Sequence, residues 1–166
     1  MSIIDRIDRD IRTAVVTVSD TRTRETDKGG QLVKKYLTEI NAVVADENYI
    51  IVTDDISKIK ESVQQLLNSD IDAVITTGGT GIARRDVTLE ALEPLFDKKI
   101  EGFGEIFRML SYTEDIGSRS ILSRAAAGTY GNKVIISLPG STGAVKLAME
   151  ELVIPELNHL VYELNK

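Results

Sequence analysis

Residues 76–88 read TTGGTGIARRDVT, in which Gly78, Gly79 and Gly81 are followed by two arginines and an aspartate. Glycine admits positive φ angles and has no Cβ, so backbone N–H groups in such a stretch can approach a ligand closely. A glycine-rich turn between a strand and a helix is typical of phosphate-binding loops. A tight turn that binds nothing is the alternative. Because the glycines cluster at the end of an apolar segment, we interpret the stretch as an anion-binding loop.

A second glycine-containing stretch, PGSTGA, spans residues 139–144 and also follows an apolar segment. Gly140 and Gly143 permit close approach, and Ser141 or Thr142 can cap a helix or donate a hydrogen bond to an anion. Two such loops at one edge of a sheet would grip an elongated phosphorylated ligand from both sides. The first loop is not a Walker A motif, because Ile82 follows its last glycine, and it also fails the G-x-G-x-x-G dinucleotide pattern.

Two aspartates, Asp54 and Asp86, follow predicted strands, where carboxylates can hold Mg²⁺ beside a triphosphate. For each of them, capping of the next helix is the local alternative. One of Arg84 and Arg85 can pair with a phosphate while the other is paired elsewhere or exposed. The chain contains no cysteine and one histidine, His159, which argues against thiolate chemistry, a catalytic triad and a His-rich metal centre. We therefore expect direct transfer between bound substrates, driven by positioning and metal electrostatics.

The composition is typical of a globular protein: 166 residues, 42% hydrophobic and 28% charged. This length predicts a single domain, residues 1–166. A net charge of -6, a pI near 4.9 and the absence of tryptophan argue against broad nucleic-acid binding. The charged N-terminus lacks the apolar run of a signal peptide, and no stretch approaches the ~20 apolar residues of a membrane span. We expect a cytoplasmic protein that does not bind membranes.

Apolar segments alternate with segments of helical periodicity. Strands are expected over residues 12–19, 48–55, 72–77 and 133–138, and helices over residues 28–40, 57–68, 88–96 and 144–164. Residues 102–128 carry a helical pattern broken at Gly117. Thr88 is the expected N-cap of its helix, and Pro155 marks a break or the first turn of a final helix. The alternation predicts an α/β fold, a three-layer α/β/α domain with a mainly parallel central sheet, and ligands beyond the carboxyl ends of the strands.

Several motifs in a fixed order carry a resemblance: TTGGTG, RRDVT, EGFGEIFRMLS, LSRAAAG and LPGSTGAV. Together they resemble the MoaB/MogA family of molybdenum cofactor biosynthesis proteins, from SDTRTRETDKGG to the last helix. The resemblance implies a molybdopterin-binding α/β/α domain that assembles as a trimer, or as a hexamer of two trimers. Active members are similar to a molybdopterin adenylyltransferase. In that reaction, the terminal phosphate of the pterin attacks the α-phosphate of Mg-ATP, which gives adenylated molybdopterin and pyrophosphate.

The resemblance also assigns roles to residues of this chain. Asp54 and Asp86 match the catalytic aspartates that position Mg²⁺ and the reacting phosphates, and Ser19 and Asp20 match a motif near the nucleotide. The substrate-binding residues that it implies are Thr76, Thr77, Gly78, Gly79, Thr80, Gly81, Arg85, Pro139, Gly140, Ser141 and Thr142. The expected partners are molybdopterin, ATP, further copies of this chain and other proteins of the same pathway.

The chain retains RRDVT, which favours activity, but Leu89 stands where the family often has proline, a change expected to affect the helix start. A non-catalytic molybdopterin carrier and a purely structural assembly partner are the alternatives. A binder needs the glycine loops, whereas a transferase also needs the two aspartates. For Glu105, Ser123 and Arg124, a site role and a structural role both remain open. The apolar residues of the EGFGEIFRMLS stretch are expected in the core or at a subunit interface; they are Ile106, Phe107, Met109 and Leu110.

Overall fold

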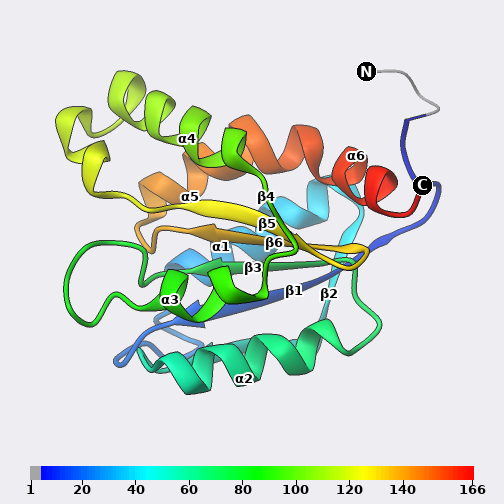
Figure 1. The fold of residues 1–166 in the computed structure, drawn as a ribbon, viewed down its shortest axis with the longest axis horizontal. Helices are drawn as coiled ribbons and strands as arrows, with labels where there is room; N and C mark the ends of the chain where they lie inside the picture. The colour runs from blue at the N-terminus through cyan, green and yellow to red at the C-terminus, as the bar shows by residue number, and fades with distance from the viewer. Residues whose placement is uncertain (1–4) are drawn as a thin grey trace.

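The computed structural model describes residues 5–166 and contains one six-stranded sheet with helices on both faces (Figure 1). The strand order is β2-β1-β3-β6-β5-β4. The strands are β1 Ile11–Val18, β2 Ala42–Val52, β3 Ala73–Thr77, β4 Lys98–Lys99, β5 Ala126–Tyr130 and β6 Lys133–Leu138. The α-helices are α1 Lys28–Leu37, α2 Ile56–Leu67, α3 Thr88–Leu92, α4 Glu101–Glu114, α5 Thr142–Ala148 and α6 Ile154–Leu164. Three 3-10 segments, η1 Thr38–Ile40, η2 Glu93–Leu95 and η3 Gly117–Leu122, and a π-helical turn, η4 Met149–Val153, complete the order.

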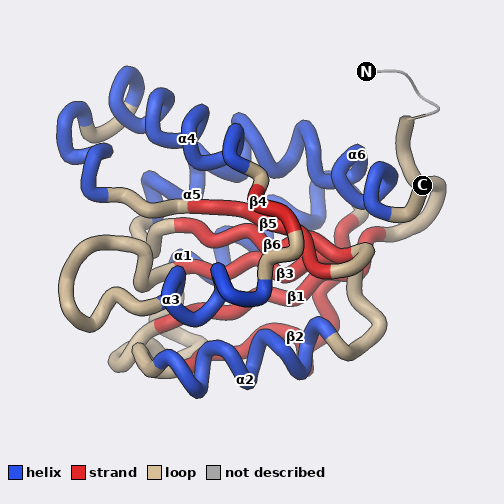
Figure 2. The backbone as a smooth tube through the Cα atoms, in the orientation of Figure 1, coloured by secondary structure: helices blue, strands red, loops and turns tan. Residues whose placement is uncertain are grey.

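The sheet is mainly parallel, as the sequence predicts. Strands β2, β1, β3 and β6 are parallel, and β5 and β4 extend the sheet in antiparallel pairing. Alternate residues of the central strands enter two separate hydrophobic clusters, so both faces of the sheet are buried. Helices α1, α4, α5 and α6 cover one face, and α2 and α3 cover the other, which gives the three layers seen in Figure 2.

The predicted strands are confirmed, but β2 begins earlier than expected, at Ala42. This strand lies at the edge of the sheet, and most side chains in its first half are exposed or only partly buried. Polar residues such as Asp46 and Glu47 are therefore tolerated there, and no apolar run announces the strand. Its second half, around Tyr49, is the part that matches the prediction.

The helical prediction for residues 102–128 is wrong at its end. Helix α4 and the 3-10 segment η3 are separated near Gly117, which has a φ of 63°, but Ala126–Tyr130 is strand β5. Alanine favours helices, so the sequence AAAG indicates one. Strand pairing overrides this preference, because residues 126–130 pair antiparallel with β6. Gly128 also packs closely, since a Cβ there would lie 2.3 Å from Cγ of Phe96. The short strand β4 was not predicted at all.

Neither Asp54 nor Asp86 caps the helix that follows it, since the N-cap of α2 is Asp55 and that of α3 is Val87. Asp55, not Asp54, caps α2 by accepting a hydrogen bond from the backbone N of Lys58 at 2.9 Å. Ser141 caps α5 in the same way, as one of the expected alternatives. The expectation that Thr88 caps α3 is wrong: Thr88 is the first residue of the helix, and its hydroxyl donates to the Gly78 carbonyl at 2.8 Å. Its side chain is therefore used to fix the glycine loop.

The C-terminal helical region runs from α5 through the π-helical turn η4 into α6. Pro155 lies in the first turn of α6, which confirms that part of the prediction. Proline has no N–H to donate to the preceding turn, and the wider π-helical geometry directly precedes it. No helix within residues 5–166 is long and apolar enough to cross a membrane.

The amino ends of the central strands are joined by Asp72, whose side chain is only 3% exposed. It accepts hydrogen bonds from the guanidinium of Arg9 at 2.7 and 2.8 Å and from the backbone N of Arg12 at 2.8 Å. Burial acts to raise the pKa of Asp72, but the hydrogen bonds from Arg9 and Arg12 outweigh it and hold this pKa well below its usual range. The ionised carboxylate therefore stabilises the folded state.

We predict that Asp72→Asn lowers the free energy of unfolding by about 1–3 kcal/mol at pH 7. A carboxylate with a depressed pKa contributes stability above its unfolded pKa of about 3.9 and loses it as the pH falls through the folded value. The difference from wild type should therefore shrink below about pH 4 in urea unfolding. Asp70→Asn is the matched control, because exposed Asp70 should contribute less than about 1 kcal/mol. A wild-type–variant difference that stays constant down to pH 2 would contradict the assigned role.

Candidate functional site

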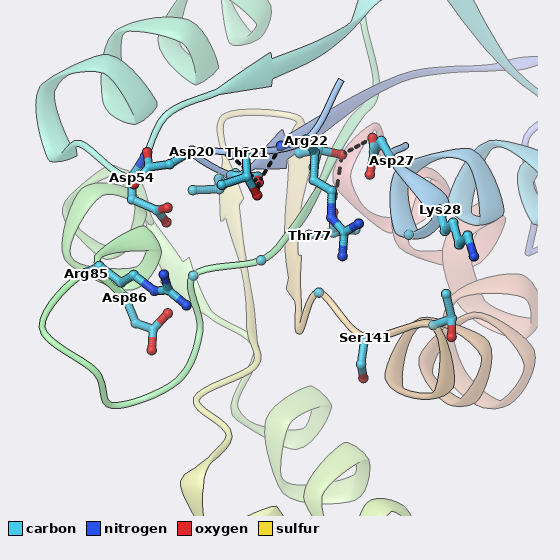
Figure 3. A pocket seen from close by; sticks show the side chains of 18 residues that line it. Asp20, Thr21, Arg22, Asp27, Lys28, Asp54, Thr77, Arg85, Asp86 and Ser141 are labelled. Atoms are coloured by element: carbon cyan, nitrogen blue, oxygen red, sulfur yellow. Dashed lines mark hydrogen bonds between the residues drawn. The ribbon is translucent and has the colours of Figure 1, made fainter. Parts of the chain in front are cut away.

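A cavity of about 600 Å³ lies at the carboxyl ends of the parallel strands. The segments after β1, β2, β3 and β6 each contribute to its wall, at the strand ends where the sequence predicts a ligand (Figure 3). The predicted site residues that line it are Ser19, Asp20, Asp54, Thr77, Gly78, Gly79, Arg85, Asp86, Gly140, Ser141 and Thr142. Residues far apart in the sequence thus form one continuous surface.

The two glycine bends lie directly against each other. The backbone N of Gly78 donates to the carbonyl of Leu138 at 2.9 Å, and a Cβ on Gly140 would lie 3.3 Å from Cα of Gly78. Gly78 and Gly79 have φ values of 94° and 71°, in the region that favours glycine. A Cβ on Gly78 would also lie 2.5 Å from the carbonyl oxygen of Val18. Close backbone packing therefore requires glycine here, and it leaves main-chain atoms at the cavity wall.

Carboxylates gather on one side of the cavity, where Figure 3 shows Asp20, Asp54 and Asp86 beside Arg85. One oxygen of Asp20 accepts a hydrogen bond from the backbone N of Asp54 at 2.9 Å. Burial raises the pKa of Asp54, and the charge of Asp20 raises it further, while Arg85 acts in the opposite direction. A cation bound at this side would relieve the repulsion and favour the ionised form of Asp54.

The carboxylates do not form a complete metal site by themselves. Within residues 5–166, no three or more His, Cys, Asp or Glu side chains are grouped to hold a metal ion. Mg²⁺ is commonly bound by one or two protein carboxylates together with substrate phosphates and water. Asp54 and Asp86 are oxygen donors of the kind that Mg²⁺ prefers, so this side of the cavity fits a magnesium ion that arrives with a phosphorylated substrate.

Cationic side chains occupy other parts of the wall. Arg22 and Lys28 line the cavity with Ser141, and Figure 3 shows Lys28 and Ser141 on the side away from Asp54. Sequence reasoning missed Arg22 and Lys28, although it placed their loop at the site. The signal was available, since both are cations in the segment SDTRTRETDKGG that follows β1. The cavity therefore presents three carboxylates with Arg85 at one side and Lys28 at the other.

Beneath the cavity floor, Asp27 organises a buried network that sequence reasoning also missed. Asp27 caps α1, is 2% exposed, and accepts hydrogen bonds from the hydroxyls of Thr17 and Tyr49 and from the backbone N of Gly30. Thr77, on β3, donates to Thr17 at 3.3 Å. Burial, together with the hydrogen bond to Asp27 and its charge, raises the pKa of Tyr49. This network ties the start of α1 to the strand that carries the glycine loop.

Four predicted binding residues lie outside the cavity lining: Thr76, Thr80, Gly81 and Pro139. Thr76 is fully buried, and its hydroxyl pairs with that of Ser137 at 2.8 Å. The carbonyls of Thr80 and Gly81 accept hydrogen bonds from Arg124. The geometry thus favours a role for these residues in shaping the loops.

The residues whose roles were left open also lie away from the cavity. Ser123 and Arg124 line a separate, smaller cavity of about 240 Å³, and Glu105 lines neither. Within EGFGEIFRMLS, Phe107 belongs to the core, whereas Ile106 and Met109 are exposed. His159 lies on α6 between Glu156 and Glu163.

Comparison with known proteins places this fold and its cavity in a class of pterin-cofactor proteins. The family described as "Probable molybdopterin binding domain" matches residues 14–159. The chain belongs to this family, within the MoaB/MogA group of molybdenum cofactor biosynthesis proteins. It is 63% identical to molybdenum cofactor biosynthesis protein B of Staphylococcus carnosus (strain TM300), over 97% of this chain and 95% of the relative.

Solved structures agree with this assignment. A crystal structure of molybdenum cofactor biosynthesis protein B, 52% identical, superposes with a TM-score of 0.91 and covers 95% of this chain and 97% of that chain. The tungsten cofactor synthesizing protein MoaB from Pyrococcus furiosus is 36% identical, with a TM-score of 0.85 over 96% of this chain and 100% of its own. This chain is thus a molybdenum cofactor biosynthesis protein with a molybdopterin-binding domain.

We predict that Gly79→Ala lowers the free energy of unfolding by about 1–3 kcal/mol, because of its positive φ and the lack of space. A Cβ at this position would lie 2.2 Å from the hydroxyl oxygen of Thr88. Gly102→Ala in α4 is the control, since nothing lies within 4 Å of its added Cβ; it should be neutral or stabilise by up to about 1 kcal/mol. Thermal and urea unfolding measure both. Equal stability of Gly79→Ala and wild type would count against the close packing of the glycine loops.

Proposed function

We propose that this protein adenylylates molybdopterin with Mg-ATP and releases pyrophosphate. The observation that carries the proposal is the convergence of two backbone-lined glycine bends with Asp54 and Asp86 in one cavity. The family supplies molybdopterin as the ligand class. Two phosphorylated substrates suit a wall that offers main-chain atoms, Arg22, Lys28 and Arg85. We further propose that the reaction takes place in the cytoplasm.

In the proposed reaction, an oxygen of the pterin's terminal phosphate forms a bond to the α-phosphorus of ATP. The bond from that phosphorus to the bridging oxygen breaks, and the electron pair leaves with pyrophosphate. Since the nucleophile belongs to a substrate, the protein needs neither cysteine nor a histidine base. The backbone around Gly78 and Gly140 and the guanidinium of Arg85 orient the phosphates, which lowers the entropic cost of bringing two anions together.

Asp54 and Asp86 would hold Mg²⁺ together with phosphate oxygens. A magnesium ion bound there supplies positive charge that offsets the charge developing at the transferred phosphate. The raised pKa of Asp54 fits this role, because the carboxylate is partly buried beside like charges that a cation would balance. Asp20 helps to position Asp54, because its carboxylate accepts a hydrogen bond from the backbone N of Asp54.

A non-catalytic molybdopterin carrier is the second candidate. The observation that favours it is the direct contact between the two glycine bends, which is made without Asp86. The carrier would use the glycine bends and would not depend on Asp86. The two functions therefore differ in their sensitivity to a change at this one carboxylate.

We predict that Asp86→Asn lowers pyrophosphate release by at least about 100-fold while molybdopterin affinity stays within about threefold of wild type. Asparagine keeps an oxygen that can accept the bond from the backbone N of Ala83, now 3.0 Å from Asp86, so the turn is preserved. A decrease in pyrophosphate release in this variant then reflects the loss of the negative charge of Asp86. The assay contains molybdopterin, ATP and magnesium, and Asp10→Asn, which lies outside the cavity, is the control. Wild-type turnover in Asp86→Asn would refute the catalytic role, and no release by wild type would favour the carrier.

We propose that copies of this chain associate as a trimer or hexamer through an apolar surface on α4 and η3. Its residues are Ile106, Met109, Tyr112, Ile121 and Leu122, which are 52%, 64%, 57%, 79% and 45% exposed. A contiguous exposed patch of large apolar residues marks a site of protein association. A second copy of the chain is the occupant that the family resemblance implies, and other proteins of the pathway are further candidates.

We predict that wild type has the mass of a trimer or hexamer in light scattering coupled to size-exclusion chromatography. The double variant Met109→Glu, Ile121→Glu should shift this mass towards the monomer, because it places charge in the apolar surface. Ile82→Glu is the matched control: Ile82 is 67% exposed but lies in another loop, so the mass should not change. Identical masses for wild type and the double variant would refute this surface as the interface.

A further inference from the structure

Arg124 holds the segment that carries Arg85 and Asp86, although it lies outside the main cavity. It follows η3 in sequence, and its backbone N donates to the Thr80 carbonyl at 2.9 Å. Its guanidinium donates through Nε to the carbonyl of Gly81 at 2.9 Å and through Nη2 to that of Asp86 at 3.0 Å. The Arg124 side chain thus forms hydrogen bonds to both ends of the segment 81–86.

The remaining hydrogen bonds of this segment are local. The backbone N of Asp86 donates to the carbonyl of Ala83 at 2.9 Å, and the backbone N of Ala83 donates to the Asp86 carboxylate. Ile82 is 67% exposed and provides no core anchor. Among the hydrogen bonds of residues 5–166, those that join segment 80–86 to a distant part of the chain come from Arg124. The turn is thus closed locally, but its placement depends on Arg124.

Glu90, on α3, fixes the guanidinium of Arg124 from the other side. Its carboxylate oxygens lie 2.6 and 3.0 Å from Nη1 and Nη2. The hydrogen bond from Arg124 lowers the pKa of Glu90, so this carboxylate stays ionised. Arginine suits the position because its planar fork of donors can serve two carbonyls and a carboxylate at once. A lysine ammonium at the same place cannot reproduce this set of bonds.

We propose that Arg124 is a positioning residue for the transfer reaction: it places the Asp86 carboxylate and the Arg85 guanidinium at the cavity without touching the substrates. This inference rests on the proposed function. The glycine bends at Gly78 and Gly140 have their own backbone contacts and do not depend on Arg124. Loss of the Arg124 hydrogen bonds should therefore lower turnover more than pterin binding, because a small displacement of a catalytic group lowers the reaction rate strongly.

The test compares Arg124→Met, which keeps the length but removes all donors, with Arg124→Lys and with Arg119→Met. Exposed Arg119 on η3 serves as the matched control. We expect Arg124→Met to lower kcat by about 10- to 100-fold with the KM for molybdopterin within about threefold of wild type. Arg124→Lys should recover only part of this loss, and Arg119→Met should match wild type. Hydrogen exchange at the amides of residues 82–87 should accelerate at least about tenfold in Arg124→Met.

Three outcomes overturn the proposal: unchanged exchange at residues 82–87 in Arg124→Met, accelerated exchange with an unchanged kcat, or equal loss of turnover in Arg119→Met. Affinity for magnesium pyrophosphate, measured by calorimetry, separates failure of this inference from failure of the proposed function. Wild type that neither releases nor binds pyrophosphate would overturn both. Wild type that turns over normally alongside a fully active Arg124→Met would overturn the positioning role alone.

Discussion

The site depends on the close approach of two backbone bends at the carboxyl ends of the adjacent strands β3 and β6. The backbone N of Gly78 donates a hydrogen bond to the carbonyl of Leu138, and a Cβ on Gly140 would lie only 3.3 Å from Cα of Gly78, so the two bends pack closely. The sheet register sets this contact, because Thr77 and Leu138 are paired at the end of the two strands. The fold therefore determines how the two loops pack against each other. Its strand pairing brings their main chains together at the wall of one cavity.

Charge is distributed around this surface in a way that suits two phosphorylated molecules. Asp20, Asp54 and Asp86 are arranged where a divalent cation would reduce their repulsion, and Lys28 lies on the opposite side. Buried Asp27 connects the start of α1 to the strand beneath the glycines through hydroxyl groups. Polar groups below the floor thus fix the loops, while the charges above it remain available to ligands.

The sequence predicts the sheet and the glycine loops well, because apolar strands and clustered glycines are local signals. It predicts strand β5 wrongly, since alanine favours helices locally, whereas the backbone of residues 126–130 pairs with β6 and β4. Arg22 and Lys28 were missed because a cation in a long loop gives no local sign that it faces a cavity. The role of Arg124 could not be decided either, as its partners lie about forty positions earlier in the chain. What sequence patterns leave out is the long-range contact.

The ends of the described chain lie far from the cavity, at the amino ends of the strands (Figure 1). Near one end, the backbone N of Ile7 donates a hydrogen bond to the side chain of Asn158. Near the other end, the side chain of Asn165 accepts a hydrogen bond from Asn132, in the turn before β6. A tether or an additional catalytic module could therefore be joined near either end without closing the mouth between the glycine bends.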